Sequence, residues 1–171
     1  MKITWFGGTT VRIHTGGRIL VGDPAPQPGL SADELVSGAD ASFSFEGGLP
    51  EIDPVLWKPA RPGSMLKESD LPEVLVHGVK GGALVAALGE PPLLLLAKGL
   101  PEAGRWSHEA VVVLFGPELL SEGRAVLKTL APRLLCLAGP EAAAEAAAAE
   151  LVEDLGDTAL VILEAGLALE V

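Results

Sequence analysis

Two segments in the second half of the chain are almost entirely apolar. Ala110 to Phe115 reads AVVVLF, and Arg133 to Leu137 continues as LLCL after its first residue. Strands without a polar face are typical of parallel sheets, whose two faces are both covered. Glu122 to Leu130 lies between them and places small or apolar residues on one helical face: Gly123, Val126, Leu127 and Leu130. The order strand, helix, strand predicts an α/β chain with helices outside a sheet.

Short strands are predicted over much of the remaining chain. They share apolar side chains and a nearby Gly or Pro, and they are residues 3–5, 11–14, 18–21, 41–45, 74–77, 83–86 and 93–96. Gly16-Gly17 predicts a hairpin turn between the second and the third. Alternation along the second strand puts His14 on its solvent side. Ser31 is predicted to cap a short helix that precedes the fourth.

The chain is predicted to end with one more helix and a hairpin. Pro140 can open an Ala-rich helix at its first turn. Ala165-Gly166 is predicted to turn a hairpin formed by residues 159–163 and 167–171. Gly47 to Leu71 is instead rich in Pro, Gly and charged residues, and we expect a long loop there, of a kind that is often functional. Because no linker divides the 171 residues, we expect one domain over residues 1–171.

Charge and cysteine content exclude several classes of function. The formal net charge is −11 and the 12 Lys and Arg form no basic run, so we expect neither nucleic acid nor an anionic membrane as partner. No apolar stretch approaches the length of a bilayer span, and the N-terminus lacks the apolar core of a secretory signal. Cys136 has no partner for an internal disulfide, which favours a reducing, cytoplasmic location. Its apolar neighbours predict that it is a small core residue.

Thermolabile side chains are scarce in this composition. The chain has no Asn, Gln27 is its only Gln, and 14 residues are Pro. This pattern predicts a melting temperature above the mesophile range of about 45–65 °C. A GC-rich genome would produce a similar composition without added stability, and the melting temperature distinguishes the two explanations.

The opening of the chain combines four features in a recognisable order. They are a strand from Met1 to Gly7, a second from Val11 to Thr15, a third from Gly17 to Val21, and the Asp23-Pro24 that ends it. Together with the later order of elements from Ala110 onward, this opening resembles the metallo-β-lactamase-fold hydrolases, in the branch of the sugar-phosphate lactonases. The resemblance implies a shortened αββα sandwich, in which two packed sheets have helices outside.

The resemblance also implies where metal ligands would lie. In that family two metal ions, usually zinc, activate a bridging water for attack on an acyl or phosphoryl centre. Their His-x-His-x-Asp-His run corresponds to Glu46–Glu51, which reads EGGLPE and has Gly48 and Pro50 at ligand positions. Further positions of the family fall on Gly8, Leu100 and Gly139. Because Gly, Pro and Leu side chains offer zinc no donor, we expect no metal cofactor, with a divalent ion as the alternative.

Four side chains remain as candidates for a site. Asp23 matches an Asp beside the family's metal cleft, although an Asp before proline is also a common turn residue. With Asp23, Glu46 and Glu51 would suit calcium, magnesium or manganese; otherwise they are solvated loop acids. His108 precedes a buried strand, near the sheet end where this fold has its cleft. It is therefore a catalytic candidate, and a surface histidine otherwise.

Three functions are compatible with these residues. The first is a metal-free, catalytically silent relative of these hydrolases that acts as a binding or interaction module. The second is a metal-dependent hydrolase with a site rebuilt from Asp23, Glu46 and Glu51 with His108. The third is a structural subunit of a homo-oligomer. The sequence names no small-molecule or protein ligand for any of them, and the metal content of the protein distinguishes the first two.

Overall fold

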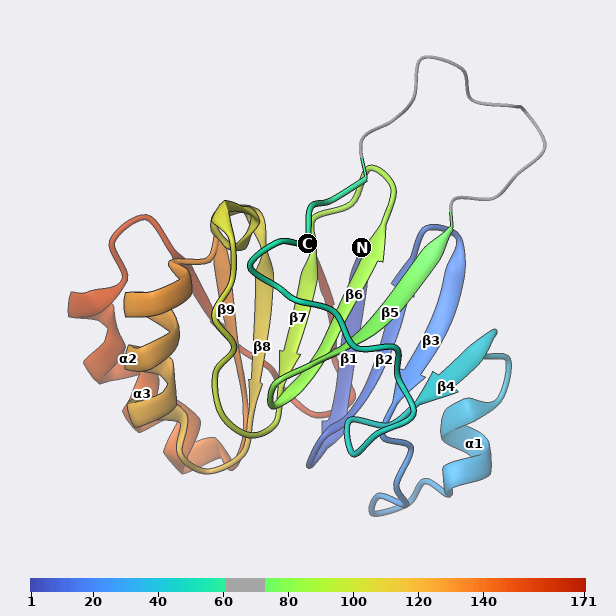
Figure 1. The fold of residues 1–171 in the computed structure, drawn as a ribbon. Coiled ribbons are helices and arrows are strands. Elements are labelled where there is room, and N and C mark those ends of the chain that lie inside the picture. Colours follow the sequence, from blue (N-terminus) through green and yellow to red (C-terminus); the bar gives the residue numbers. More distant parts are fainter. Residues whose placement is uncertain (61–72) are drawn as a thin grey trace.

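Two β-sheets packed face to face form the centre of the protein. The computed structural model describes residues 1–60 and 73–171, and the last part of the predicted loop, residues 61–71, lies outside them (Figure 1). The first sheet has the strand order β11-β1-β2-β3-β4, and the second has the order β10-β9-β8-β7-β6-β5. The helices lie outside this pair of sheets. The mixed α/β class and the two-sheet core with outer helices are therefore confirmed.

The first sheet is mostly antiparallel and follows the alternation of the sequence. Its strands are β1 (Lys2–Gly7), β2 (Thr10–Thr15), β3 (Arg18–Gly22), β4 (Ala41–Phe43) and β11 (Ala168–Glu170). Gly16 and Gly17 join β2 to β3 with φ angles of 54° and 74°, a turn geometry that favours glycine at both positions. Only β4 is parallel to its neighbour, β3. The predicted hairpin turn is confirmed.

A short helix, α1 (Ala32–Val36), connects β3 to β4. Ser31 caps it through its side chain and Glu34 completes the capping box, as predicted for Ser31. Arg12 lies between the inward-facing Val11 and Ile13, so its side chain leaves the outer face of the sheet. Its guanidinium donates to the carbonyl of Leu35 at 2.8 Å and thereby ties α1 to this face.

The second sheet contains the buried apolar strands. Its members are β5 (Val74–Val79), β6 (Gly82–Ala87), β7 (Leu93–Leu96), β8 (Val111–Phe115), β9 (Leu134–Ala138) and β10 (Ala159–Ile162). Every residue of β7, β8 and β9 is buried, and β7 to β10 are parallel to one another. This arrangement confirms the prediction made from the absence of a polar face.

Two helices cover the outer face of the parallel strands. They are α2 (Leu119–Leu130) and α3 (Glu141–Leu151), and short 3-10 helices, η1 (Arg105–Glu109) and η2 (Val152–Asp154), precede β8 and follow α3. The predicted face of α2 is buried as expected. A Cβ at Gly123 would lie 2.8 Å from Leu151 Cδ1, so glycine permits the close approach of α2 and α3. In residues 1–60 and 73–171, no helix has the length and apolar content needed to cross a membrane.

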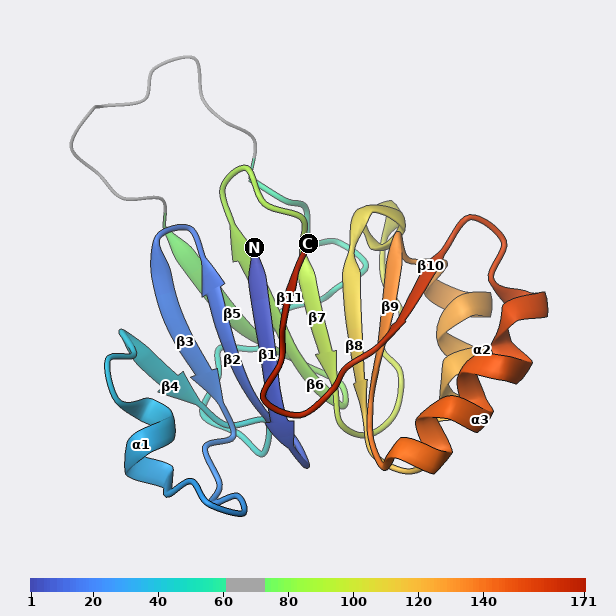
Figure 2. The ribbon, with the colours of Figure 1, turned by 180° about the vertical axis from the view of Figure 1, so that it is seen from behind.

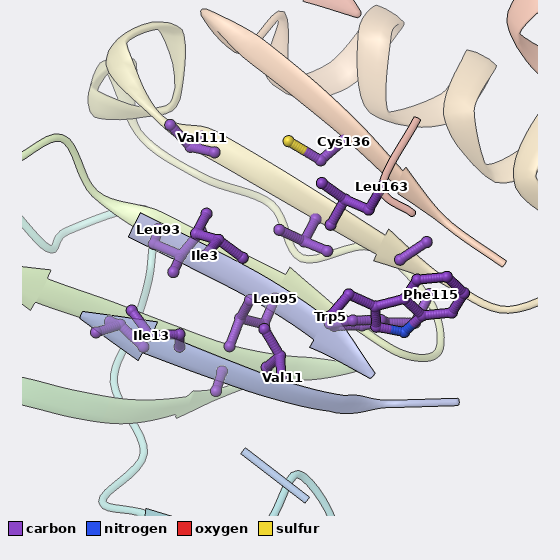
Figure 3. Packing of buried hydrophobic residues seen from close by; sticks show 14 of the residues in the cluster. Ile3, Trp5, Val11, Ile13, Leu93, Leu95, Val111, Phe115, Cys136 and Leu163 are labelled. Carbon is purple, nitrogen blue, oxygen red and sulfur yellow. The ribbon is translucent and has the colours of Figure 1, made fainter. Parts of the chain in front are cut away.

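Side chains from both sheets interdigitate in the space between them. Ile3 and Ile13 of the first sheet meet Leu93 and Leu95 of the second, and all four are fully buried (Figure 3). Cys136 belongs to the same layer and is 0% exposed. Burial raises the pKa of its thiol to about 12. Cys136 is therefore a core residue, as its sequence context predicted.

The predicted C-terminal hairpin is wrong. β10 pairs in parallel with β9, whereas β11 pairs antiparallel with β1, so the two strands belong to different sheets. The chain crosses between the sheets after Leu163, which is buried in the inner layer, and Gly166 donates to the carbonyl of Trp5 at 2.7 Å (Figure 2). Ala165-Gly166 does turn the chain, but each strand forms its hydrogen bonds with the edge of an existing sheet and not with the other strand.

Candidate functional site

The register of the parallel strands gives the sandwich two distinct ends. Leu93 pairs with Val111, and Val111 pairs with Leu134, so the residues before β7, β8 and β9 lie together. We call this end, marked by Pro92, Ala110 and Arg133, the amino edge. The opposite end, where β8 and β9 finish, is the carboxyl edge. The five residues of β8 separate the two by about 13 Å.

The first sheet is aligned with these two ends. The ammonium group of Met1 lies 3.0 Å from the carboxylate of Glu90, just before β7, so β1 begins at the amino edge. The ring of Phe45 lies 5.8 Å from that of Phe115, so the segment after β4 lies at the carboxyl edge. In Figure 1 the amino edge is uppermost and α1 lies near the lower, carboxyl edge. The resemblance implies metal ligands at this lower end.

Asp23 lies at the carboxyl edge, where its backbone and side chain join β3 to the end of β4. Its Oδ1 accepts a hydrogen bond from the amide of Phe45 at 2.9 Å, and its amide donates to the carbonyl of Phe43 at 2.8 Å. Its carbonyl accepts from the hydroxyl of Thr10 at 2.7 Å. Its φ of 42° is left-handed, a conformation that Asp tolerates better than most residues. These hydrogen bonds are typical of a turn residue, which is one of the two interpretations of Asp23; the other is an acid beside a metal cleft.

Glu46 and Glu51 are exposed and are not gathered around Asp23. The amide of Glu46 donates to Ser44 Oγ at 3.2 Å, and Glu51 forms an isolated bridge with Gly78 on β5. The neighbouring bond from the Gly78 amide to the Pro50 carbonyl, at 2.9 Å, attaches this segment to the edge of the second sheet. Among the described residues, no three His, Cys, Asp or Glu side chains are grouped so that they could hold a metal ion.

Aromatic side chains fill the carboxyl edge between the sheets. The rings of Phe43 and Phe45 have centroids 5.8 Å apart, and Phe45 contacts Phe115 at the same distance. Trp5 and Phe115 belong to the same buried cluster (Figure 3), and the indole of Trp5 donates to the carbonyl of Gly8 at 3.0 Å. This end of the sandwich is therefore closed by packed rings at positions next to the implied ligands.

Two of the implied ligand positions, Gly139 and Leu100, are occupied by the packing of the chain itself. A Cβ at Gly139 would overlap the carbonyl oxygen of Gly116 and would lie 3.0 Å from Leu119 Cδ1, so a histidine there requires movement of the backbone. Leu100 packs against the apolar layer under the outer face of the second sheet. Glycine at position 139 is thus required by the packing of this chain.

The expectation that His108 lies near the cleft end of the family is wrong. His108 belongs to η1, which precedes β8, and it is exposed at the amino edge. The length of β8 separates this edge from Asp23, so the two residues cannot act on one small substrate. The sequence indicated correctly that His108 precedes a buried strand, but it did not indicate at which end of the sandwich that strand begins.

The amino edge contains a cleft of about 1190 Å³. Segments far apart in the sequence line it: residues 55 and 57–60, residues 89–92, residues 104–106, 108 and 109, and Arg133. Its wall includes Trp57 and Trp106, whose rings meet edge to face at 4.9 Å. Lys58, Arg105 and Arg133 line it as well. The expectation of function in the loop after Gly47 is relevant here, because its described residues 55 and 57–60 form one side of this cleft.

A smaller cleft of about 540 Å³ lies on the other side of Glu90. It is lined by the two ends of the chain and by the turn after β2, and His14 faces it. Partial burial, together with the charges of Arg12 and Lys2, lowers the pKa of His14. His14 is therefore half-buried in a shallow cleft, whereas its position on the strand predicted free exposure.

Apart from His108, the residues that line the larger cleft carry no pattern that predicted a site. Lys58, Arg105 and Arg133 occur singly, and no motif connects them. The available signal was the tryptophans: two of the three in the chain, Trp57 and Trp106, stand next to one of these basic residues. In a chain with 4% aromatic residues, that coincidence could have directed attention to them.

Comparisons with known proteins found one structural likeness. No family model and no curated protein match the sequence. A crystal structure of a protein from Thermotoga maritima, assigned as a Zn-dependent hydrolase of the metallo-β-lactamase superfamily, matches 96% of this chain and 99% of its own. The two have 15% sequence identity and a TM-score of 0.48. A likeness at this level implies neither shared metal ligands nor a shared substrate.

Proposed function

We propose that this protein is a metal-independent binding module built on a two-sheet sandwich of the metallo-β-lactamase type. Its carboxyl edge, where the resemblance implies a metal-dependent active site, would serve as a packed end of the core. Its amino edge, which is hollow and carries charged and aromatic side chains, would hold the ligand.

The geometry at Gly139 carries this proposal. A metal ligand at that position needs a side chain, and a side chain there would overlap the backbone of Gly116. Two further features agree with it. The carboxylate of Asp23 is already bonded to the amide of Phe45, and the phenylalanine rings occupy the neighbouring space. A zinc site needs several donors that converge at about 2.0–2.3 Å, held by further hydrogen bonds.

Metal content tests the proposal. We expect protein purified without an affinity tag or a chelator to contain no stoichiometric transition metal by mass spectrometry. We also expect no rise in melting temperature on addition of zinc, manganese or calcium. A ligand at a hundredfold excess over its Kd stabilises the folded state by about 2.7 kcal/mol, which such a melt detects easily.

The alternative hypothesis, a hydrolase with a rebuilt metal site, predicts the opposite result in the same experiment. Stoichiometric metal that survives dialysis and is lost in Asp23→Ala or Glu46→Ala would replace the binding module with a carboxylate-based metal site. Such a site would have to work without His108, which lies at the other edge. The third possibility, a homo-oligomer, has one specific observation in its favour: Val55 and Leu56 are 48% and 74% exposed beside the larger cleft. Light scattering at several protein concentrations tests it.

A further inference from the structure

We propose that the amino-edge cleft binds a small organic anion: a carboxylate or phosphate group attached to a flat, apolar ring. The inference rests on the proposed function and deepens it, because it names the chemical class of ligand. Three features of the cleft favour such a ligand: two arginines whose side chains have no partner among the described residues, the charge balance and the aromatic wall.

Both cleft arginines differ from the other arginines that the structure describes. Arg12 donates to backbone carbonyls, Arg18 pairs with Asp40 at 3.0 Å, and Arg124 pairs with Glu150 and Asp154. Within residues 1–60 and 73–171, the side chains of Arg105 and Arg133 have no hydrogen-bond or ion-pair partner. Both residues line the same cleft. A guanidinium offers paired donors that match a carboxylate or a phosphate.

The charge balance of the cleft is opposite to that of the whole protein. Lys58, Arg105 and Arg133 contribute positive charge, and Glu90 and Glu109 contribute negative charge. The ammonium group of Met1, at 3.0 Å, already balances Glu90. Among the described residues that line the cleft, the remaining excess is positive, in a chain whose formal net charge is −11. A compact anion is attracted by this local field, whereas a long polyanion such as nucleic acid meets repulsion from the surrounding surface.

The wall beside these charges suits a flat, apolar group. Trp106 is 7% exposed, and its indole nitrogen donates to the Pro54 carbonyl at 2.7 Å, which holds the ring in position. Trp57 packs against it edge to face, and Pro91 and Pro92 line the adjacent surface. A rigid aromatic wall loses little conformational entropy on binding. The volume of about 1190 Å³ leaves ample room for a ligand of this kind.

The positions of the tryptophans provide a direct test. The full-length protein, labelled with ¹⁵N, is titrated with phenyl phosphate and, separately, with phenylacetate, and the indole N–H signals are followed by NMR. We expect the signals of Trp57 and Trp106 to shift, while Trp5, at the carboxyl edge, stays in place. The two titrations distinguish a phosphate from a carboxylate as the preferred head group. Inorganic phosphate and benzyl alcohol each lack one half of the ligand and should bind at least about tenfold more weakly.

Substitution of the arginines tests the anion contact. Arg105→Gln and Arg133→Gln should each weaken the binding of the better probe about tenfold, because each removes a charge-assisted hydrogen bond. Arg124→Gln, on α2, is the matched control and should leave the affinity unchanged. Melting curves of all three variants verify that they fold.

Several results would overturn the inference. These are absence of binding by both probes, equal shifts at Trp5, an affinity unaffected by loss of both arginines, or equally tight binding of benzyl alcohol. A failure of the proposed function would look different, because it consists of bound metal that depends on Asp23, at the other end of the sandwich.

Discussion

The two edges of the sandwich are built from the same strands but have opposite characters. At the carboxyl edge, aromatic rings and tight glycine turns fill the space between the sheets, and the carboxylate of Asp23 is bonded within the fold. At the amino edge, segments from four parts of the sequence leave a cleft with a tryptophan wall and two arginines whose side chains have no partner among the described residues. The sandwich is therefore filled at one end and hollow at the other.

The residues that build the two layers are different from those that give each edge its chemistry. Packing between the layers requires apolar side chains along the strands, and both ends of each strand provide them. The residues just beyond the strand ends are under no such constraint, and they decide whether an edge is filled or hollow. If the carboxyl edge is structural and the amino edge is free to bind, substitutions at the two edges should differ in their effect on stability.

The largest effect is expected where the carboxyl edge is tightest. Gly139→His restores a ligand type at an implied metal position but forces a side chain against the Gly116 carbonyl and Leu119. We expect the free energy of unfolding to fall by about 3 kcal/mol, measured by urea denaturation. Gly48→His is the matched control, since a Cβ at Gly48 meets nothing within 4 Å. It should be the milder change, with a loss of about 1–2 kcal/mol from its left-handed φ of 83°. Equal stability of the Gly139 variant and the wild type would show that this edge can open.

Asp23 should contribute to the same edge through its hydrogen bonds. Asp23→Ala removes the acceptor for the Phe45 amide and puts alanine in a left-handed conformation, so we expect a loss of about 2–3 kcal/mol in urea denaturation. Asp23→Asn keeps an acceptor oxygen and tolerates this conformation, so it should recover most of the lost stability. A metal-binding carboxylate would behave differently, because the neutral amide would not replace it.

Cys136 tests the core between the two edges. Cys136→Ser buries a hydroxyl among apolar side chains, and we expect the free energy of unfolding to decrease by about 2 kcal/mol without effect on ligand binding. Burial raises the pKa of the thiol from 9.0 to about 12, so the folded protein keeps this proton when the unfolded chain has lost it. The thiol's contribution to stability is therefore full below pH 9 and is lost as the pH rises toward 12. Cys136→Ala should lack this part of the pH dependence. Rapid modification of the native thiol by a disulfide reagent would contradict the burial.

The smallest effect is expected at the amino edge. Arg105 and Arg133 are exposed and their side chains have no partner among the described residues, so their replacement by Gln should change the free energy of unfolding by no more than about 0.5 kcal/mol. Denaturation in urea, at the same pH as for Asp23→Ala, measures the difference between the edges. A destabilisation comparable to that of Asp23→Ala would mean that the amino edge is also part of the structural core.

Local pattern was sufficient for most of the elements. The apolar runs of β8 and β9, the buried face of α2, the cap at Ser31 and the turn at Gly16-Gly17 each depend on residues close together in the sequence. The same reasoning identified Cys136 as a core residue and Asp23 as a possible turn acid. The residue types alone also showed that glycine and proline at the implied ligand positions offer no donor to a metal.

Only the tertiary structure decided where these elements meet. Residues 159–163 and 167–171 are suited to a hairpin, yet β10 extends one sheet and β11 the other, because the edges of β9 and β1 were available to them. His108 could not be assigned to an edge until the register of β8 was known. The larger cleft joins the segment around Trp57, Glu90, Trp106 and Arg133, which are separated by tens of residues. Sequence determines the local preference of each segment, whereas pairing and cavities depend on long-range packing, which no short window of residues contains.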